Sequence, residues 1–165
     1  MTMQIEPGLI RKLRSYFIPL PANMGAHVIR VSNQAIANNL WVQVRNFSVP
    51  AAAPFYNTAG HWAAGTPDVL TCIRAGQHQV SGCIQFAANA TGDRGLAITI
   101  NGLFSVVREL IRASSALETE ISISKSVWLE AGDALSLHAF QTSGAPLNAQ
   151  YTTNLSPTFS IARIP

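Results

Sequence analysis

Apolar and polar residues alternate strictly between residues 77 and 88, which is the pattern of a β-strand with two distinct faces. One face carries the apolar and small residues Val80, Gly82, Ile84, Phe86 and Ala88, and the other carries Gln77, Gln79, Ser81, Cys83, Gln85 and Ala87. Turn residues flank this strand, with Ala75-Gly76 before it and a Gly-rich segment at 89–95 after it. Each turn leads to another apolar stretch, at 68–74 and 96–100, so we predict two consecutive antiparallel hairpins.

The same alternation continues along the rest of the chain. Strands are predicted at 27–31, 40–47, 118–129, 135–140 and 158–164. Asn101-Gly102 is typical of a hairpin turn, whereas the segment 103–112 fits a helical stripe as well as a strand. After the predicted strand at 40–47, the composition of residues 49–65 predicts a long surface loop with one short strand near 55–58. About eight to ten strands joined by loops favour an all-β, antiparallel sandwich of the Greek-key or jelly-roll type.

The N-terminal segment is organised differently. Apolar residues fall at helix-like spacing, and basic residues lie between them. The residues expected to bind a partner are the apolar Leu9, Ile10, Leu13 and Phe17 and the basic Arg11, Lys12 and Arg14. Prolines at 7, 19 and 21 limit any helix to about three turns, which is marginal for an isolated helix in water. The segment is therefore either a frayed tail or an arm that orders when it docks on an acidic protein surface. Its brevity and prolines disfavour a membrane-surface helix.

Composition adds an argument for self-association. The 165 residues suit one domain, and only 12% of them are charged, about half the usual share of roughly 25%. So few charges leave much neutral or apolar surface, which we expect to be covered by sister subunits. The net charge of +3 is too small to indicate nucleic-acid binding.

The sequence predicts neither secretion nor a membrane span. Residues 1–25 lack the continuous apolar core of a signal peptide, and no apolar run approaches the roughly 20 residues that cross a bilayer. If Ala75-Gly76 centres a hairpin, Cys72 and Cys83 lie roughly 13 Å apart, beyond the reach of a disulfide. We therefore expect two buried, free thiols in a protein made in a cytoplasm.

The search for catalytic and metal-binding motifs is negative, and we expect no enzymatic activity, no cofactor and no metal site. No phosphate-binding loop, nucleophile elbow or His/Cys metal motif occurs. Glu118 and Glu120 share one strand face, so they could form a glycosidase-like pair of carboxylates only with a cleft around them, and we favour two acids on an exposed edge. Asp93 and Arg94 predict a local ion pair or a hydrogen-bonded turn. The four histidines, at 27, 61, 78 and 138, are separated in sequence and are expected to be structural or exposed.

One aromatic cluster leaves two interpretations open. Tyr56, His61 and Trp62 lie in the predicted loop at 49–65. Clustered aromatic side chains on a loop can bind sugars by stacking on apolar ring faces. They also serve to close the end of a β-sandwich or to pack against a sister subunit, and we favour this second role.

Four segments together resemble one known family. They are VSNQAIANNLWVQV at 31–44, FAANATGDRG at 86–95, LEAGDALSL at 129–137 and SPTFSIARI at 156–164. These segments resemble the strands and turns of the C1q/TNF-like jelly roll, in the stand-alone form found in bacteriophage structural proteins. The resemblance covers residues 27–164 and implies a strand at 103–112. It divides the chain into an N-terminal arm at 1–26 and a jelly-roll domain at 27–165.

The resemblance implies a homotrimer that packs about a threefold axis. The small, neutral face with Ser81, Cys83 and Gln85 is the expected trimer interface. A trimer that carries an N-terminal arm favours one function, that of a phage capsid decoration (cement) protein on the virion surface, whose arm binds the major capsid protein. The alternative is a receptor-binding tip of a tail or fibre that holds a host glycan. Neither function requires direct contact with nucleic acid or a membrane.

Overall fold

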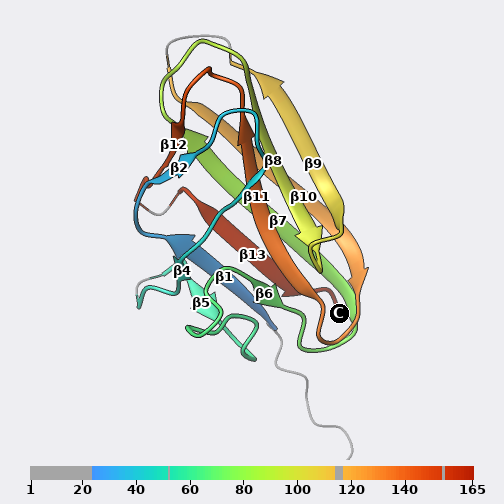
Figure 1. The fold of residues 1–165 in the computed structure, drawn as a ribbon. Coiled ribbons are helices and arrows are strands. Elements are labelled where there is room, and N and C mark those ends of the chain that lie inside the picture. The colour runs from blue at the N-terminus through green and yellow to red at the C-terminus, as the bar shows by residue number, and fades with distance from the viewer. Residues whose placement is uncertain (1–23, 52, 114–116, 154) are drawn as a thin grey trace, which may run out of the picture.

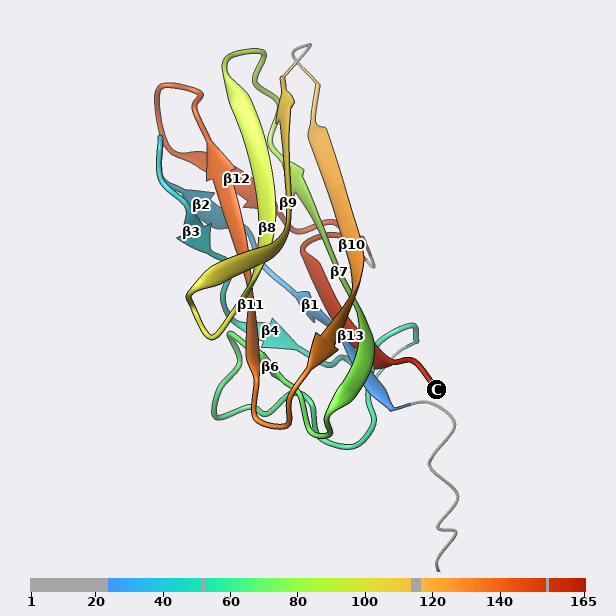
Figure 2. The ribbon, with the colours of Figure 1, turned by 90° about the vertical axis from the view of Figure 1, so that its right-hand side faces the viewer.

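The computed structural model describes residues 24–51, 53–113, 117–153 and 155–165, and in these ranges it contains thirteen strands and no helix. The strands form two antiparallel sheets that pack face to face (Figures 1 and 2). Since the described ranges hold no helix, they also hold none long and apolar enough to cross a membrane. The predicted arm residues Leu9–Phe17 lie outside the described residues, whereas Gly25 and Ala26, assigned to the arm above, belong to the first strand.

The larger sheet has eight strands in the order β2-β12-β7-β13-β1-β4, with β10 also paired to β7 and β5 to β1. Its strands are β1 (Gly25–Arg30), β2 (Gln34–Ile36), β4 (Phe47–Ser48), β5 (Tyr56–Asn57), β7 (Gly76–Phe86), β10 (Thr119–Leu129), β12 (Leu147–Gln150) and β13 (Thr158–Arg163). The long strands β7 and β10 pair along their whole length, from Gly76 opposite Leu129 to Phe86 opposite Thr119. The predicted short strand near 55–58 is confirmed as β5.

The smaller sheet has five strands in the order β3-β11-β8-β9, with β6 also paired to β11. Its strands are β3 (Val42–Gln43), β6 (Leu70–Thr71), β8 (Asp93–Ile100), β9 (Phe104–Arg112) and β11 (Ala134–Gln141). The segment with ambiguous periodicity is thus a strand, β9, as the family resemblance implied. The hairpin at Asn101-Gly102 is confirmed, because β8 pairs with β9 and both turn residues have positive φ, 51° and 69°.

The hydrophobic core lies between the two sheets. The inward residues of β7 and those of β8 and β11 are fully buried, as the alternation predicted: Val80, Ile84, Phe86, Leu96, Ile98, Leu135 and Leu137. Gly82 faces the opposite sheet, and a Cβ atom there would lie 2.5 Å from Cδ1 of Leu137. The glycine therefore sets how closely the two sheets pack at the middle of β7.

The prediction of two consecutive hairpins around β7 is wrong. The strand before it, β6, pairs with β11, and the strand after it, β8, belongs to the other sheet. The partners of β7 are instead β10, β12 and β13, which are distant in sequence. Turn residues allow the chain either to form a hairpin within one sheet or to cross to the other sheet, and here both turns carry the chain from one sheet to the other.

Candidate functional site

The outward face of β7 runs along the centre of the eight-stranded sheet. Ser81, Cys83 and Gln85, the predicted interface residues, point away from the core and are half-buried within the single chain. The register places Ser81 between Ser124 of β10 and Ser160 of β13. We call the outward residues of β7 and β13, together with those of β10 that lie between Glu120 and Trp128, the neutral face; they are Gln77, Gln79, Ser81, Cys83, Gln85, Ser122, Ser124, Ser126, Thr158, Ser160 and Ala162.

Hydrogen bonds across the strands occupy many polar groups of the neutral face. Ser81 Oγ and Ser160 Oγ are 2.6 Å apart. On the other side of β7, Gln79 Nε2 donates to Ser124 Oγ at 2.5 Å, and Gln77 Nε2 donates to Ser126 Oγ at 2.8 Å. Because these groups are already paired within the sheet, covering the face would leave few polar atoms without a partner.

Two ionisable groups on this side of the sheet are both held in their uncharged forms. Burial raises the pKa of the Cys83 thiol. On the adjoining strand β1, burial lowers the pKa of the His27 imidazole, whose ring packs edge-on against Phe55 at 5.0 Å and Tyr56 at 6.3 Å. The face is thus neutral at pH 7, and the charge of Glu120 lies opposite Gln85 at one end of it.

At the other end of the neutral face stands the exposed side chain of Trp128, opposite Gln77. Its exposed fraction is 62%, and its indole Nε1 donates to Glu130 Oε1 at 2.8 Å. An indole this exposed at the margin of an uncharged face is typical of a protein–protein contact.

The three loop aromatics do not converge on one surface. His61 is buried at 1% exposure, with Nδ1 2.9 Å from the carbonyl of Thr71, and burial lowers its pKa. Trp62 packs against the hydrophobic core, and its main-chain N–H donates to Asn57 Oδ1. Tyr56, by contrast, is 39% exposed beside His27. A ligand on this loop would therefore meet Tyr56 first.

Both cysteines are free, as predicted, but only Cys72 is fully buried and Cys83 is half-buried. Cys72 Sγ lies 3.8 Å from Nε2 of His78, and burial raises the pKa of its thiol. A thiol with a raised pKa is a poor nucleophile. Among the described residues, no group of three or more His, Cys, Asp or Glu side chains is placed to hold a metal ion.

Arg94 organises the Gly-rich turn rather than a site. Its side chain is fully buried, with Nη1 donating to the carbonyls of Thr91 and Asp93 at 2.9 and 3.0 Å and Nη2 donating to that of Asn89 at 2.9 Å. The guanidinium also lies 5.9 Å from the ring centroid of Phe86. The predicted hydrogen-bonded turn at Asp93 and Arg94 is confirmed, and the arginine serves the fold.

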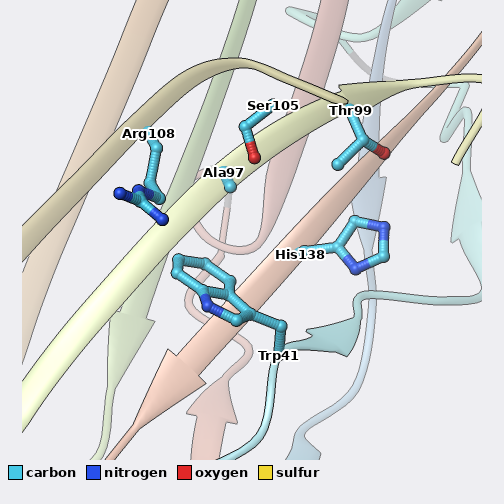
Figure 3. Close-up of a pocket in the computed structure, with 6 residues that line it drawn as sticks. All are labelled: Trp41, Ala97, Thr99, Ser105, Arg108 and His138. Carbon is cyan, nitrogen blue, oxygen red and sulfur yellow. The ribbon is translucent and has the colours of Figure 1, made fainter. Parts of the chain in front are cut away.

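The structure also contains a basin that the sequence did not predict, on the outward face of the five-stranded sheet (Figure 3). Its volume is about 200 Å³, and its lining residues are Trp41, Ala97, Thr99, Ser105, Arg108 and His138. The sequence does show two small residues at alternate positions of β8, Gly95 and Ala97. They indicate a hollow only when large side chains flank them, and the register of the neighbouring strands decides which side chains these are.

No protein-family model matches this chain, and no curated protein matches its sequence. Solved structures do match. Eiger TNF from S. frugiperda aligns with a TM-score of 0.64 at 8% identity, over 87% of this chain and 93% of that chain. Murine APRIL at pH 5.0 aligns with a TM-score of 0.64 at 12% identity, over 86% and 99% of the two chains. A second murine APRIL structure, at pH 8.0, gives 0.61 at 15% identity over 86% and 99%.

At these identities the comparisons define the fold. The chain has a TNF-like jelly-roll fold, which confirms the fold class that the sequence resemblance implied.

Proposed function

We propose that this protein is a non-enzymatic, homotrimeric structural protein of a phage virion, and specifically a capsid decoration protein. The observation that carries the proposal is the neutral face of the eight-stranded sheet. Its outward residues are small or uncharged, its polar groups are largely paired, and His27 and Cys83 beside it are held neutral by burial.

Such a face is suited to be covered by another copy of the chain. Burying unpaired charges in an interface costs several kcal/mol, and this face carries none between its two ends. Its serines also allow a second backbone to approach closely. Three copies about a threefold axis would each place this face against a different patch of the next copy, and such heterologous contacts close into a ring.

The position on a capsid rests on the sequence resemblance and on the N-terminal segment. An arm with three basic residues between apolar ones suits an acidic, partly apolar surface of a major capsid protein. Arm and trimer together would bind several capsid subunits at once, and such multivalent attachment strengthens binding without new contacts.

Placing a charge on the neutral face tests whether the protein forms a trimer through it. Ser81→Glu places a carboxylate at the middle of the neutral face, and we expect it to convert a trimer into monomers in sedimentation velocity. The matched control is Ser105→Glu, which makes the same change at an exposed position of the other sheet. A wild-type protein that sediments as a 17.7 kDa monomer at micromolar concentration would disprove the trimer.

Removing the N-terminal arm tests whether it attaches the protein to the capsid. Removing residues 1–23 leaves every described strand intact. We expect the truncated trimer to lose binding to purified capsids that lack the protein. Undiminished binding would rule the arm out as the attachment element.

A second candidate function is a receptor-binding tip of a phage tail or fibre. Tyr56 favours it, because this aromatic side chain is exposed on a loop beside half-buried His27. Binding to a glycan array that is lost in Tyr56→Ala and retained in Trp62→Phe would promote this candidate over the capsid protein.

A further inference from the structure

The basin on the five-stranded sheet exists because β8 carries a small residue where its neighbours carry large ones. The register sets Ala97 opposite Arg108 of β9 on one side and opposite His138 of β11 on the other. Ala97 is 2% exposed and forms the floor. Two residues earlier the corresponding space above Gly95 is filled by the indole of Trp41, whose Cη2 lies 2.8 Å from where a Cβ atom would be. Above Ala97 the space stays open.

The walls of the basin are chemically different at its two ends (Figure 3). Arg108 and the indole of Trp41 stand at one end, and Thr99 and His138 stand at the other, with Ser105 between them. Trp41 is held in place by stacking on Phe140, with ring centroids 5.1 Å apart and an interplanar angle of 27°. Its exposed fraction is 38%, so part of the indole remains open to a ligand.

Arg108 is the charged group of this lining, and no carboxylate lines the basin with it. Within the described residues its guanidinium makes no ion pair. An exposed guanidinium beside a concave surface favours a carboxylate, which it binds through two parallel hydrogen bonds.

The opposite end offers hydroxyl and imidazole groups. Thr99 Oγ1 and Ser136 Oγ are 2.9 Å apart, and His138 Nε2 is 3.3 Å from the same Ser136 oxygen. Burial lowers the pKa of His138, so its ring is neutral at pH 7 and can both donate and accept. Such groups recognise the hydroxyls of a sugar rather than a second negative charge.

We propose that the basin binds one acidic monosaccharide unit of a glycan, a uronic acid, with its carboxylate on Arg108 and its ring beside Trp41. The size agrees with one sugar, since about 200 Å³ is smaller than the roughly 300 to 1,000 Å³ of pockets for drug-sized ligands. The indole offers an apolar surface against which a sugar ring can lie, and the few polar groups around it can fix the orientation of the ring. The basin is formed within one chain and on the sheet opposite the neutral face, so the proposal does not depend on the trimer.

The experiment measures binding of methyl β-glucuronide to the full chain by saturation-transfer NMR and by titration of indole chemical shifts. Methyl β-glucoside is the neutral probe of the same shape. We expect saturable binding of the glucuronide, weaker binding of the glucoside, and a loss of glucuronide affinity of about tenfold or more in Arg108→Gln.

The matched control is Arg112→Gln, which removes an exposed arginine four residues along the same strand and the same face, outside the basin. Its affinity should equal that of the wild type. Trp41→Phe, which retains an aromatic ring for stacking on Phe140, should weaken both probes alike. No saturable binding up to the solubility limit, equal affinity for the two probes, or an equal loss in both arginine variants would overturn the proposal.

Discussion

Trp41 covers Gly95 so closely that a Cβ atom on the glycine would lie 2.8 Å from the indole Cη2. The indole reaches β8 from the segment just before β3 and is stacked on Phe140 of β11. A missing side chain on one strand thus determines where an aromatic ring from another segment rests. That ring then forms one side of the basin above Ala97.

We predict that Gly82→Ala destabilises the protein more than Gly95→Ala. At Gly82 the new Cβ atom would meet Leu137, which is fully buried between the sheets, so the substitution should cost about 1–3 kcal/mol. At Gly95 the two nearest atoms, at 2.8 and 2.9 Å, are the ends of the exposed side chains of Trp41 and Leu110, which can shift at a smaller cost than buried Leu137, and the third is the Cβ atom of Phe140 at 3.2 Å. Urea denaturation of the two variants would measure the difference, and equal losses would contradict it.

Arg94→Lys should destabilise the fold by about 2 kcal/mol or more. A lysine cannot reproduce the hydrogen bonds that the buried guanidinium donates to three main-chain carbonyls. The matched control is Arg45→Lys, where the side chain is 63% exposed and lies 3.9 Å from Asp68, so the change should stay within about 0.5 kcal/mol. Denaturation midpoints would report both, and indistinguishable variants would argue against the role assigned to the turn.

Stability should fall as the pH drops below about 6.5, the ordinary pKa of histidine. Burial lowers the pKa of His27, His61 and His138 in the folded chain, so the unfolded chain binds protons first and is favoured in acid. Their contribution is complete above pH 6.5 and is lost as the pH falls through the lowered pKa values. The free energy of unfolding between pH 7.5 and 5 would show this slope. His61→Gln should make it shallower, and an unchanged slope would exclude His61 as a contributor.

Cys83 should resist alkylation in the assembled protein and become reactive when the trimer is broken. Burial raises the pKa of its thiol, and the proposed subunit contact covers it as well. In Ser81→Glu we expect modification by iodoacetamide at pH 8 to be faster at Cys83 and unchanged at buried Cys72, which serves as the internal reference. Mass spectrometry of the peptides would separate the two sites. Equal rates at Cys83 before and after the substitution would contradict a contact over this face.

The sequence by itself determined which side of each long strand is buried. Alternation along β7 and β10 placed Val80, Ile84 and Ile121 inside and Ser81 and Ser122 outside, and the structure agrees at each of them. This works because the direction of a side chain depends only on its own strand, which turns each successive residue to the opposite face. Asn101-Gly102 was readable for a similar reason, since the turn is local.

Only the tertiary structure decided which strands are neighbours. The turn at Ala75-Gly76 looked like a hairpin, yet β6 pairs with β11 and β7 pairs with β10. The basin has the same origin, because Ala97, Arg108 and His138 come from three strands and meet only through their register. A short polar turn is compatible with pairing or with crossing to the other sheet. Which of the two forms depends on burying both apolar faces against each other, and that is a property of the whole chain.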